Sequence, residues 1–101
     1  MQGHGRVSAR LSLVRRARLK RDAVRGMDVL LMPETVIELN AQGAEVLRLC
    51  DGTRTLEEIV AEVASRYPAG SSADVERDVR AFVARLEDRG VLSSTPGAAQ
   101  A

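Results

Sequence analysis

Residues 39–59 read LNAQGAEVLRLCDGTRTLEEI, and this stretch decides the fold because a strand ends in it and two helices begin in it. Asn40 predicts a helix over residues 41–50, since its side chain can accept hydrogen bonds from the unpaired amides of a first helical turn. Gly52 indicates where that helix ends, because glycine readily takes the left-handed conformation that closes many helices. The apolar side of this helix carries Gly43, Val46, Leu47 and Cys50.

Residues 51–54 predict a tight turn after the first helix, and two further helices are predicted to follow it. Thr55 and Glu58 stand three residues apart, which is the spacing of a capping box in which each side chain bonds the backbone amide of the other residue. Pro68 halts the second helix, and Gly90 closes a third helix over residues 73–89. Both helices carry apolar side chains at spacings of three and four, which is typical of a helix with one face against a core. These side chains are Leu56, Ile59, Val60, Val63, Ala64 and Tyr67 in the second helix, and Val75, Val79, Phe82, Val83 and Leu86 in the third.

Three segments before this stretch predict strands. Residues 17–21 alternate small or apolar side chains with charged ones, as an edge strand does, and residues 27–32 are apolar enough for a central strand. Residues 35–39 are rich in β-branched side chains. Short turns at residues 22–26 and 33–34 join the three segments. The sequence therefore predicts an α+β domain, a three-stranded antiparallel β-meander followed by a three-helix bundle.

The two ends of the chain differ in composition from this central part. Residues 1–15 mix glycine and serine with arginines and show no periodicity, so they predict a disordered basic arm. Residues 93–101 predict a disordered tail, which leaves 16–92 as the folded domain. The net charge is +1, but eight basic residues face one acidic residue up to position 25, and seven face thirteen after it. Such a basic segment is either a solvated arm or a contact for an acidic partner.

No combination of residues predicts catalysis. Cys50 lies on the apolar side of its helix, where a lone cysteine is typically a small buried hydrophobe. His4, the only histidine, belongs to the basic arm, so no nucleophile has a general base nearby in sequence. A single cysteine forms no internal disulfide and no metal cluster, which suits the reducing cytoplasm. We expect a cytoplasmic protein that is monomeric and not an enzyme, with no metal and no cofactor.

Composition also limits the partners. No apolar run approaches the ~20 residues that span a bilayer, so no membrane association is expected. The alternative function is a nucleic-acid-binding regulator, because the short helix connections resemble helix-turn-helix geometry and residues 1–15 are basic. Against it, the third helix holds five acidic and four basic residues between positions 73 and 89, and phosphates would be repelled. This leaves the basic arm as the only candidate contact to nucleic acid.

Several motifs together resemble a known family. They are Leu39-Asn40, LCDGTRT at 49–55, Glu58-Ile59, the basic LKRD at 19–22 and RGVL at 89–92. The chain over residues 17–92 resembles the PqqD-like peptide chaperones of pyrroloquinoline quinone (PQQ) biosynthesis. Their more distant relatives are precursor-peptide recognition domains, so the resemblance also implies a winged-helix-like fold. The resemblance implies a non-catalytic chaperone that binds the ribosomally made precursor peptide of PQQ and presents it to a radical S-adenosylmethionine (SAM) enzyme.

The resemblance also implies that the peptide adds as a strand beside residues 35–39 and lies between that strand and the third helix. Residues 35–39 contain no proline, so their amides can pair with an added strand, and we expect Ile37 and Leu39 to face the core. Beside the apolar side of the third helix, alanines allow a backbone to approach and arginines can hold carboxylates. The predicted peptide-binding residues are Thr35, Val36, Ile37, Glu38, Leu39, Arg77, Arg80, Ala81 and Ala84.

Overall fold

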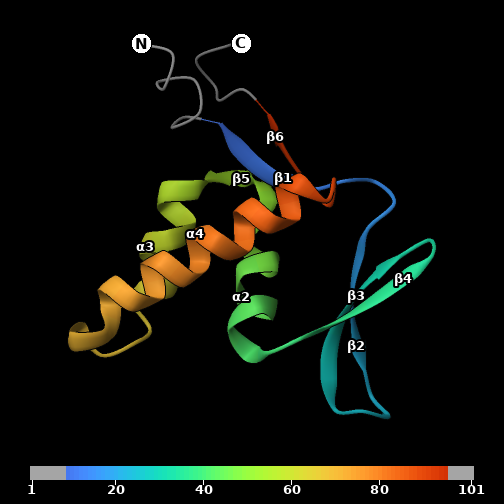
Figure 1. Cartoon of the computed structure of the whole chain (residues 1–101), viewed down its shortest axis with the longest axis horizontal. Helices are drawn as coiled ribbons and strands as arrows, with labels where there is room; N and C mark the ends of the chain where they lie inside the picture. The colour runs from blue at the N-terminus through green and yellow to red at the C-terminus, as the bar shows by residue number, and fades with distance from the viewer. Residues whose placement is uncertain (1–8, 96–101) are drawn as a thin grey trace.

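A computed structural model describes residues 9–95 of the chain. Within this range six strands form two sheets, and three α-helices lie beside them (Figure 1). The elements in chain order are β1 (Arg10–Leu13), β2 (Arg18–Asp22), β3 (Met27–Met32), β4 (Thr35–Leu39), α2 (Ala41–Leu49), β5 (Asp51–Thr55), α3 (Leu56–Ala64), the 3-10 turn η1 (Ala69–Ser71), α4 (Ser72–Asp88) and β6 (Leu92–Thr95). The chain therefore has an α+β fold.

The first sheet has the order β2-β3-β4, and both pairings are antiparallel. These are the three strands that the sequence predicts, with β2 starting one residue later than expected. Leu30 pairs with Leu19 on one side and Ile37 on the other, and it is fully buried. Ile37 packs against the core and Leu39 is buried, so the expectation that these two side chains face inward is confirmed.

The second sheet was not predicted. β1 lies at its centre and pairs antiparallel with β5 on one side and β6 on the other. The predictions of disorder at residues 10–13 and 93–95 and of a tight turn at residues 51–54 are therefore wrong, and the predicted domain limits of 16–92 are too narrow. Each strand is short, and its partners are distant in sequence. Residues 1–8 and 96–101, the remainder of the predicted arm and tail, lie outside the described residues.

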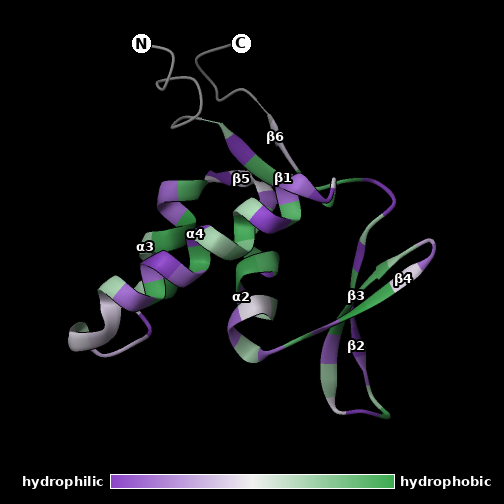
Figure 2. Ribbon diagram, in the orientation of Figure 1, coloured by the Kyte–Doolittle hydropathy of each residue, from purple (hydrophilic) through white to green (hydrophobic). Residues whose placement is uncertain are grey.

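The helix starts follow the predicted caps. The Gly43 amide donates to Asn40 Oδ1 at 2.7 Å, so Asn40 caps α2. In the capping box of α3, the Glu58 amide donates to Thr55 Oγ1 at 3.2 Å, and the Thr55 amide donates to Glu58 Oε1 at 2.9 Å. Figure 2 shows hydrophobic and hydrophilic residues alternating along α4, as expected of a helix with one buried face.

One core joins the two sheets to the helices. Its fully buried side chains come from β3, the three helices and the residue before β6: Leu30, Val46, Leu47, Ile59, Val63, Val79, Val83 and Val91. Leu11 of β1 is also buried, which ties the second sheet to the same core. The predicted meander and helices are thus only part of the architecture, which also contains the sheet β5-β1-β6. The likeness to a winged-helix fold stays a prediction. No helix within residues 9–95 is long and apolar enough to cross a membrane.

Candidate functional site

The outer edge of β4 is open in the part of the chain that the structure describes. β4 is the last strand of its sheet and pairs only with β3. A two-residue turn joins β3 to β4, and such a turn makes the flanking pair Met32–Thr35 the hydrogen-bonded one. Because hydrogen-bonded and non-hydrogen-bonded pairs alternate, the backbone groups of Val36 and Glu38 point away from β3. β4 therefore offers the amides and carbonyls of these two residues to an added strand.

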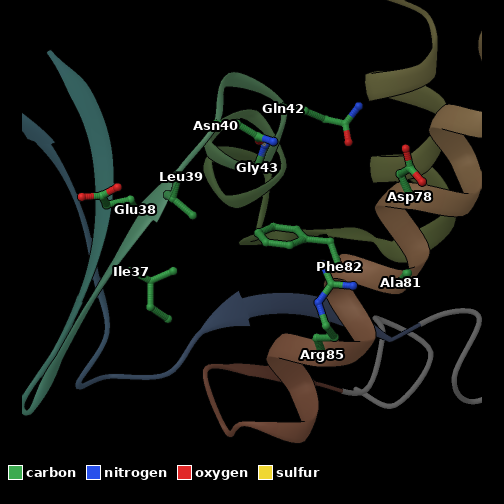
Figure 3. A pocket seen from close by; sticks show the side chains of 10 residues that line it. All are labelled: Ile37, Glu38, Leu39, Asn40, Gln42, Gly43, Asp78, Ala81, Phe82 and Arg85. Carbon is green, nitrogen blue, oxygen red and sulfur yellow. Dashed lines mark hydrogen bonds between the residues drawn. The ribbon is translucent and has the colours of Figure 1, made fainter.

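A groove lies beside this edge. Its walls are β4 and α4, and the start of α2 lies between them (Figure 3). The groove encloses about 330 Å³. Its lining residues are Ile37, Glu38 and Leu39 from β4, Asn40, Gln42 and Gly43 from the start of α2, and Asp78, Ala81, Phe82 and Arg85 from α4. The members from α4 share one face of the helix, because they are three or four residues apart.

Phe82 is the largest apolar side chain in the groove. It is half-buried, packs against the core and points toward the start of α2 in Figure 3. Gly43 makes this approach possible, since a Cβ atom at that position would lie 3.3 Å from Phe82 Cζ and 3.2 Å from Asn40 Oδ1. The glycine thus brings the aromatic ring and the helix cap close together.

Two charged residues beside the groove, Glu38 and Arg85, differ in whether they form an ion pair. Glu38 on β4 turns its carboxylate away from the groove, to the other face of the sheet, where it forms an ion pair with Arg25 at 2.7 Å (Figure 3). Arg85 on α4 has its guanidinium carbon 5.9 Å from the centre of the Phe82 ring, a cation–π distance. Among the described residues, no carboxylate forms an ion pair with Arg85. The groove therefore combines the apolar side chains of Ile37, Leu39 and Phe82 with a cation, Arg85, that is available to an incoming carboxylate. Asp78, one side chain of the same α4 face, adds a negative charge to the groove.

The structure brings together only some of the predicted site residues. Ile37, Glu38, Leu39 and Ala81 line the groove, and Thr35 and Val36 lie further along the same strand. Arg77, Arg80 and Ala84 lie on another face of α4, outside the groove. Arg80 donates to the two carboxylate oxygens of Glu57 on α3 at 2.9 and 2.7 Å. Arg77 pairs within its own helix, with Asp74 at 2.7 Å.

The residues that sequence reasoning missed are Phe82, Arg85 and Asp78 on α4, together with the start of α2. Phe82 was assigned to the buried side of its helix, and the structure places it at the boundary between core and groove. Its position at the margin of the apolar stripe was a signal, because Ala81 and Arg85 are its neighbours on the outer side. The sequence did not show which flank of the stripe faces β4.

Cys50, the single cysteine of the chain, is buried. Burial raises the pKa of the Cys50 thiol to about 12, helped by the negative charges of Asp51 and Glu87, so the thiol stays protonated. Residues 9–95 contain no group of side chains that would hold a metal ion. The open strand edge beside this groove places the chain among small α+β domains with an edge to which an extended chain can add.

Comparisons with known proteins agree with this class. The family model of coenzyme PQQ synthesis protein D (PqqD) matches residues 29–92. A "PqqA binding protein" from Rhodopseudomonas palustris (strain TIE-1) is 41% identical over 86 residues, which cover 85% of this chain and 83% of that protein. Another, from Xanthomonas oryzae pv. oryzae (strain KACC10331 / KXO85), is 40% identical over 75 residues, covering 74% and 80%.

A solved structure is also similar. It is the solution NMR structure of the PqqD truncation of Methylobacterium extorquens PqqCD, described as a functional, stand-alone recognition element for ribosomally synthesised and post-translationally modified peptides. Its TM-score is 0.67 and its sequence identity 35%, with 82% of this chain and 87% of that chain covered. The chain belongs to the PqqD family.

Proposed function

We propose that this protein binds the precursor peptide of PQQ as an added strand along β4, in the groove between β4 and α4. The observation that carries the proposal is the outward-facing backbone of Val36 and Glu38 beside that groove. Relatives named as PqqA binding proteins, one of them 41% identical, support the identity of the peptide. The protein contributes binding and no catalytic group.

Three contributions to affinity follow from the site. Backbone pairing along β4 fixes the direction of the peptide and is nearly independent of its sequence. Phe82 offers an apolar contact in the groove for one peptide side chain. Arg85 attracts a carboxylate of the peptide, and its position beside the Phe82 ring keeps the two contacts close together. Because strand addition buries little side-chain area, these two side chains decide the specificity.

We further propose that the bound peptide is presented to a radical SAM enzyme of the pathway. A peptide held along one strand edge is extended, and the part that leaves the groove is accessible to a second protein. The binding domain then raises the concentration of the peptide at the enzyme without contributing to the chemistry.

An NMR titration of the ¹⁵N-labelled protein with the synthetic precursor peptide tests the binding mode. We expect shifts at Val36, Glu38, Phe82 and Arg85, and slowed hydrogen exchange of the Val36 and Glu38 amides, because pairing occupies donors that water otherwise reaches. Shifts that cluster on α3 while β4 stays unchanged would show that the peptide binds elsewhere.

A matched pair of charge reversals sharpens this test. Arg85→Glu should weaken binding about tenfold, because it removes the cation of the groove and adds repulsion. Arg77→Glu changes the net charge equally but lies outside the groove, so it should leave the affinity nearly unchanged. Equal losses in the two variants would mean that net charge, and not the groove, decides the binding.

A further inference from the structure

The sheet β2-β3-β4 has a second face that the proposed peptide site does not use. Strand register places two rows of side chains on this outer face, Lys20–Val29–Glu38 and Arg18–Leu31–Val36. The helices lie to one side of the sheet in Figure 1, and Leu30 faces them from the opposite set of side chains. Val29 is 3% exposed and lies apart from the main core cluster that contains Leu30, so this face has a small apolar centre of its own.

A shallow hollow of about 500 Å³ opens on this face. Its apolar lining includes Val29, Leu31 and Val36 from the strands and Val24 from the turn between β2 and β3. Val24 is 96% exposed and Val36 is 56% exposed, which is unusual for large apolar side chains in a small domain. The turn is held in place, because the amides of Val24 and Arg25 both donate to Asp22 Oδ1, at 3.0 and 3.1 Å. We call this hollow and its rim the outer-face patch.

The rim of the outer-face patch carries an excess of available positive charge. Its two carboxylates, Asp22 and Glu38, are both paired with Arg25, at 3.6 and 2.7 Å. Arg18 and Lys20 are exposed, and neither forms an ion pair with another described residue. An occupant of this patch would therefore meet an apolar centre beside two unpaired cations.

We propose that the outer-face patch docks an acidic protein surface that inserts an apolar side chain into the hollow and places carboxylates opposite Arg18 and Lys20. Two like-charged rims would repel each other in a two-fold dimer of this chain, so a second copy fits poorly. Nucleic acid fits poorly as well, because the centre of the patch is aliphatic and has no aromatic ring on which bases stack.

The inference rests on the proposed function in one respect: we take the partner to be the radical SAM enzyme to which the peptide is presented. The outer-face patch and the groove lie on different sides of the sheet, so the enzyme and the peptide can be bound at the same time. Val36 is common to both surfaces, whereas Arg18 and Lys20 lie on β2, at the opposite edge of the sheet from the peptide.

The test measures the affinity of the full chain for the purified radical SAM enzyme and, separately, for the precursor peptide. Arg18→Glu with Lys20→Glu should weaken enzyme binding at least about tenfold, and Val24→Ser should weaken it by a smaller factor. The control is Arg77→Glu with Arg89→Glu, which changes the net charge by the same amount as the double patch variant. Arg77 lies on α4 and Arg89 directly after it, and both are exposed, so enzyme binding should not change. Peptide affinity should stay within about twofold in every variant, since none of these residues lines the groove.

The possible results separate this inference from the proposed function. Loss of enzyme binding in the patch variants alone supports the inference, and it holds even if the peptide binds outside the groove. Enzyme binding that is absent, or equal in all variants, overturns the inference while leaving peptide binding untouched. If a 20-base-pair DNA duplex binds as tightly as the enzyme and loses affinity in Arg18→Glu with Lys20→Glu, the patch binds nucleic acid and the inference is wrong. If the chain self-associates and the patch variants abolish this, the occupant is a second copy of the chain and the inference is also wrong.

Discussion

Cys50 shows how position sets the chemistry of a single side chain. It is 3% exposed and follows directly after the last residue of α2. Because its thiol pKa is raised to about 12, the reactive thiolate is scarce at neutral pH. We expect the native protein to resist alkylation by iodoacetamide at pH 8 and the protein unfolded in guanidinium to react completely, as measured by mass spectrometry. Rapid alkylation of the folded protein would contradict the buried assignment.

Removing the same side chain tests whether it has a role beyond packing. Cys50→Ala should lower the free energy of unfolding by about 1 kcal/mol, because a small buried volume is lost. Peptide affinity should not change, since Cys50 does not line the groove. The measurement is denaturant unfolding followed by the peptide titration. A variant that folds normally but has lost peptide binding would give the thiol a functional role.

Gly52 has the positive φ angle that its position suggested, but in a different setting. Its φ is 88°, and it lies within β5 at a break in the register with β1, not in the turn that the sequence predicted. An added Cβ would lie 3.8 Å from Ser12 Cβ, so there is space for it and only the backbone conformation is unfavourable. Gly52→Val should therefore cost about 1–2 kcal/mol in unfolding free energy. Gly70→Ala is the control, because Gly70 has no positive φ and no atom near its added Cβ.

Local rules predicted the residues that interact with near neighbours in sequence. Asn40 and the pair Thr55–Glu58 cap their helices as expected, because a cap depends on residues two or three positions away. Arg77 and Arg80 lie on the flank of α4 away from the groove, and the sequence could not show this, since periodicity identifies the buried stripe but not which element lies on each side of it. The flank is decided by packing of α4 against α3 and β4, which is information from the whole fold.

At the scale of elements, one ion pair links two helices across the surface. Arg80 on α4 donates twice to Glu57 on α3, and these hydrogen bonds lower the pKa of Glu57 below its ordinary value of 4.5. A carboxylate whose pKa is lower in the folded state stabilises the fold above its unfolded pKa and loses that contribution as the pH falls through the folded pKa. Solvent screens this exposed pair, so the effect should be small.

The prediction is a pH-dependent difference between the wild-type protein and Glu57→Gln. Above about pH 5 the wild type should have the slightly higher Tm, and the difference should shrink as the pH falls below the ordinary carboxyl range. Asp74→Gln, which removes the partner of Arg77 within α4, is the control for an ion pair that joins no second element. Thermal unfolding followed by circular dichroism between pH 3 and pH 7 measures both. A difference that grows on acidification would reverse the assigned sign.

The second sheet marks the limit of prediction at this scale. β2, β3 and β4 are adjacent in the chain, and their alternation and short turns predict both the strands and their order. β1 pairs instead with residues far away in the chain, since Arg10 pairs with Thr55, 45 positions later, and with Thr95, 85 positions later. A four-residue strand with one buried side chain has too little pattern to reveal such partners. The same reasoning explains why β5 was read as a turn.

At the scale of the whole molecule, the proposed binding mode makes a sharp distinction between neighbouring residues of β4. The amide of Val36 points to the open edge, whereas the amide of Ile37 pairs with Leu30 of β3. Val36→Pro should therefore remove a donor that only the peptide uses. Ile37→Pro should remove a donor that holds the sheet together.

We expect Val36→Pro to keep the native ¹⁵N–¹H spectrum outside β4 and to weaken peptide binding at least about tenfold, because proline lacks the donor and disfavours pairing. Val36→Ala, which keeps the amide, should bind nearly as well as the wild type, since the side chain lies on the other face of the sheet. Ile37→Pro should lower the unfolding free energy by several kcal/mol, about the cost of proline within a paired strand. If Val36→Pro is as unstable as Ile37→Pro, the assignment of the outward amides is wrong. If it folds and binds the peptide with unchanged affinity, the peptide does not add to β4.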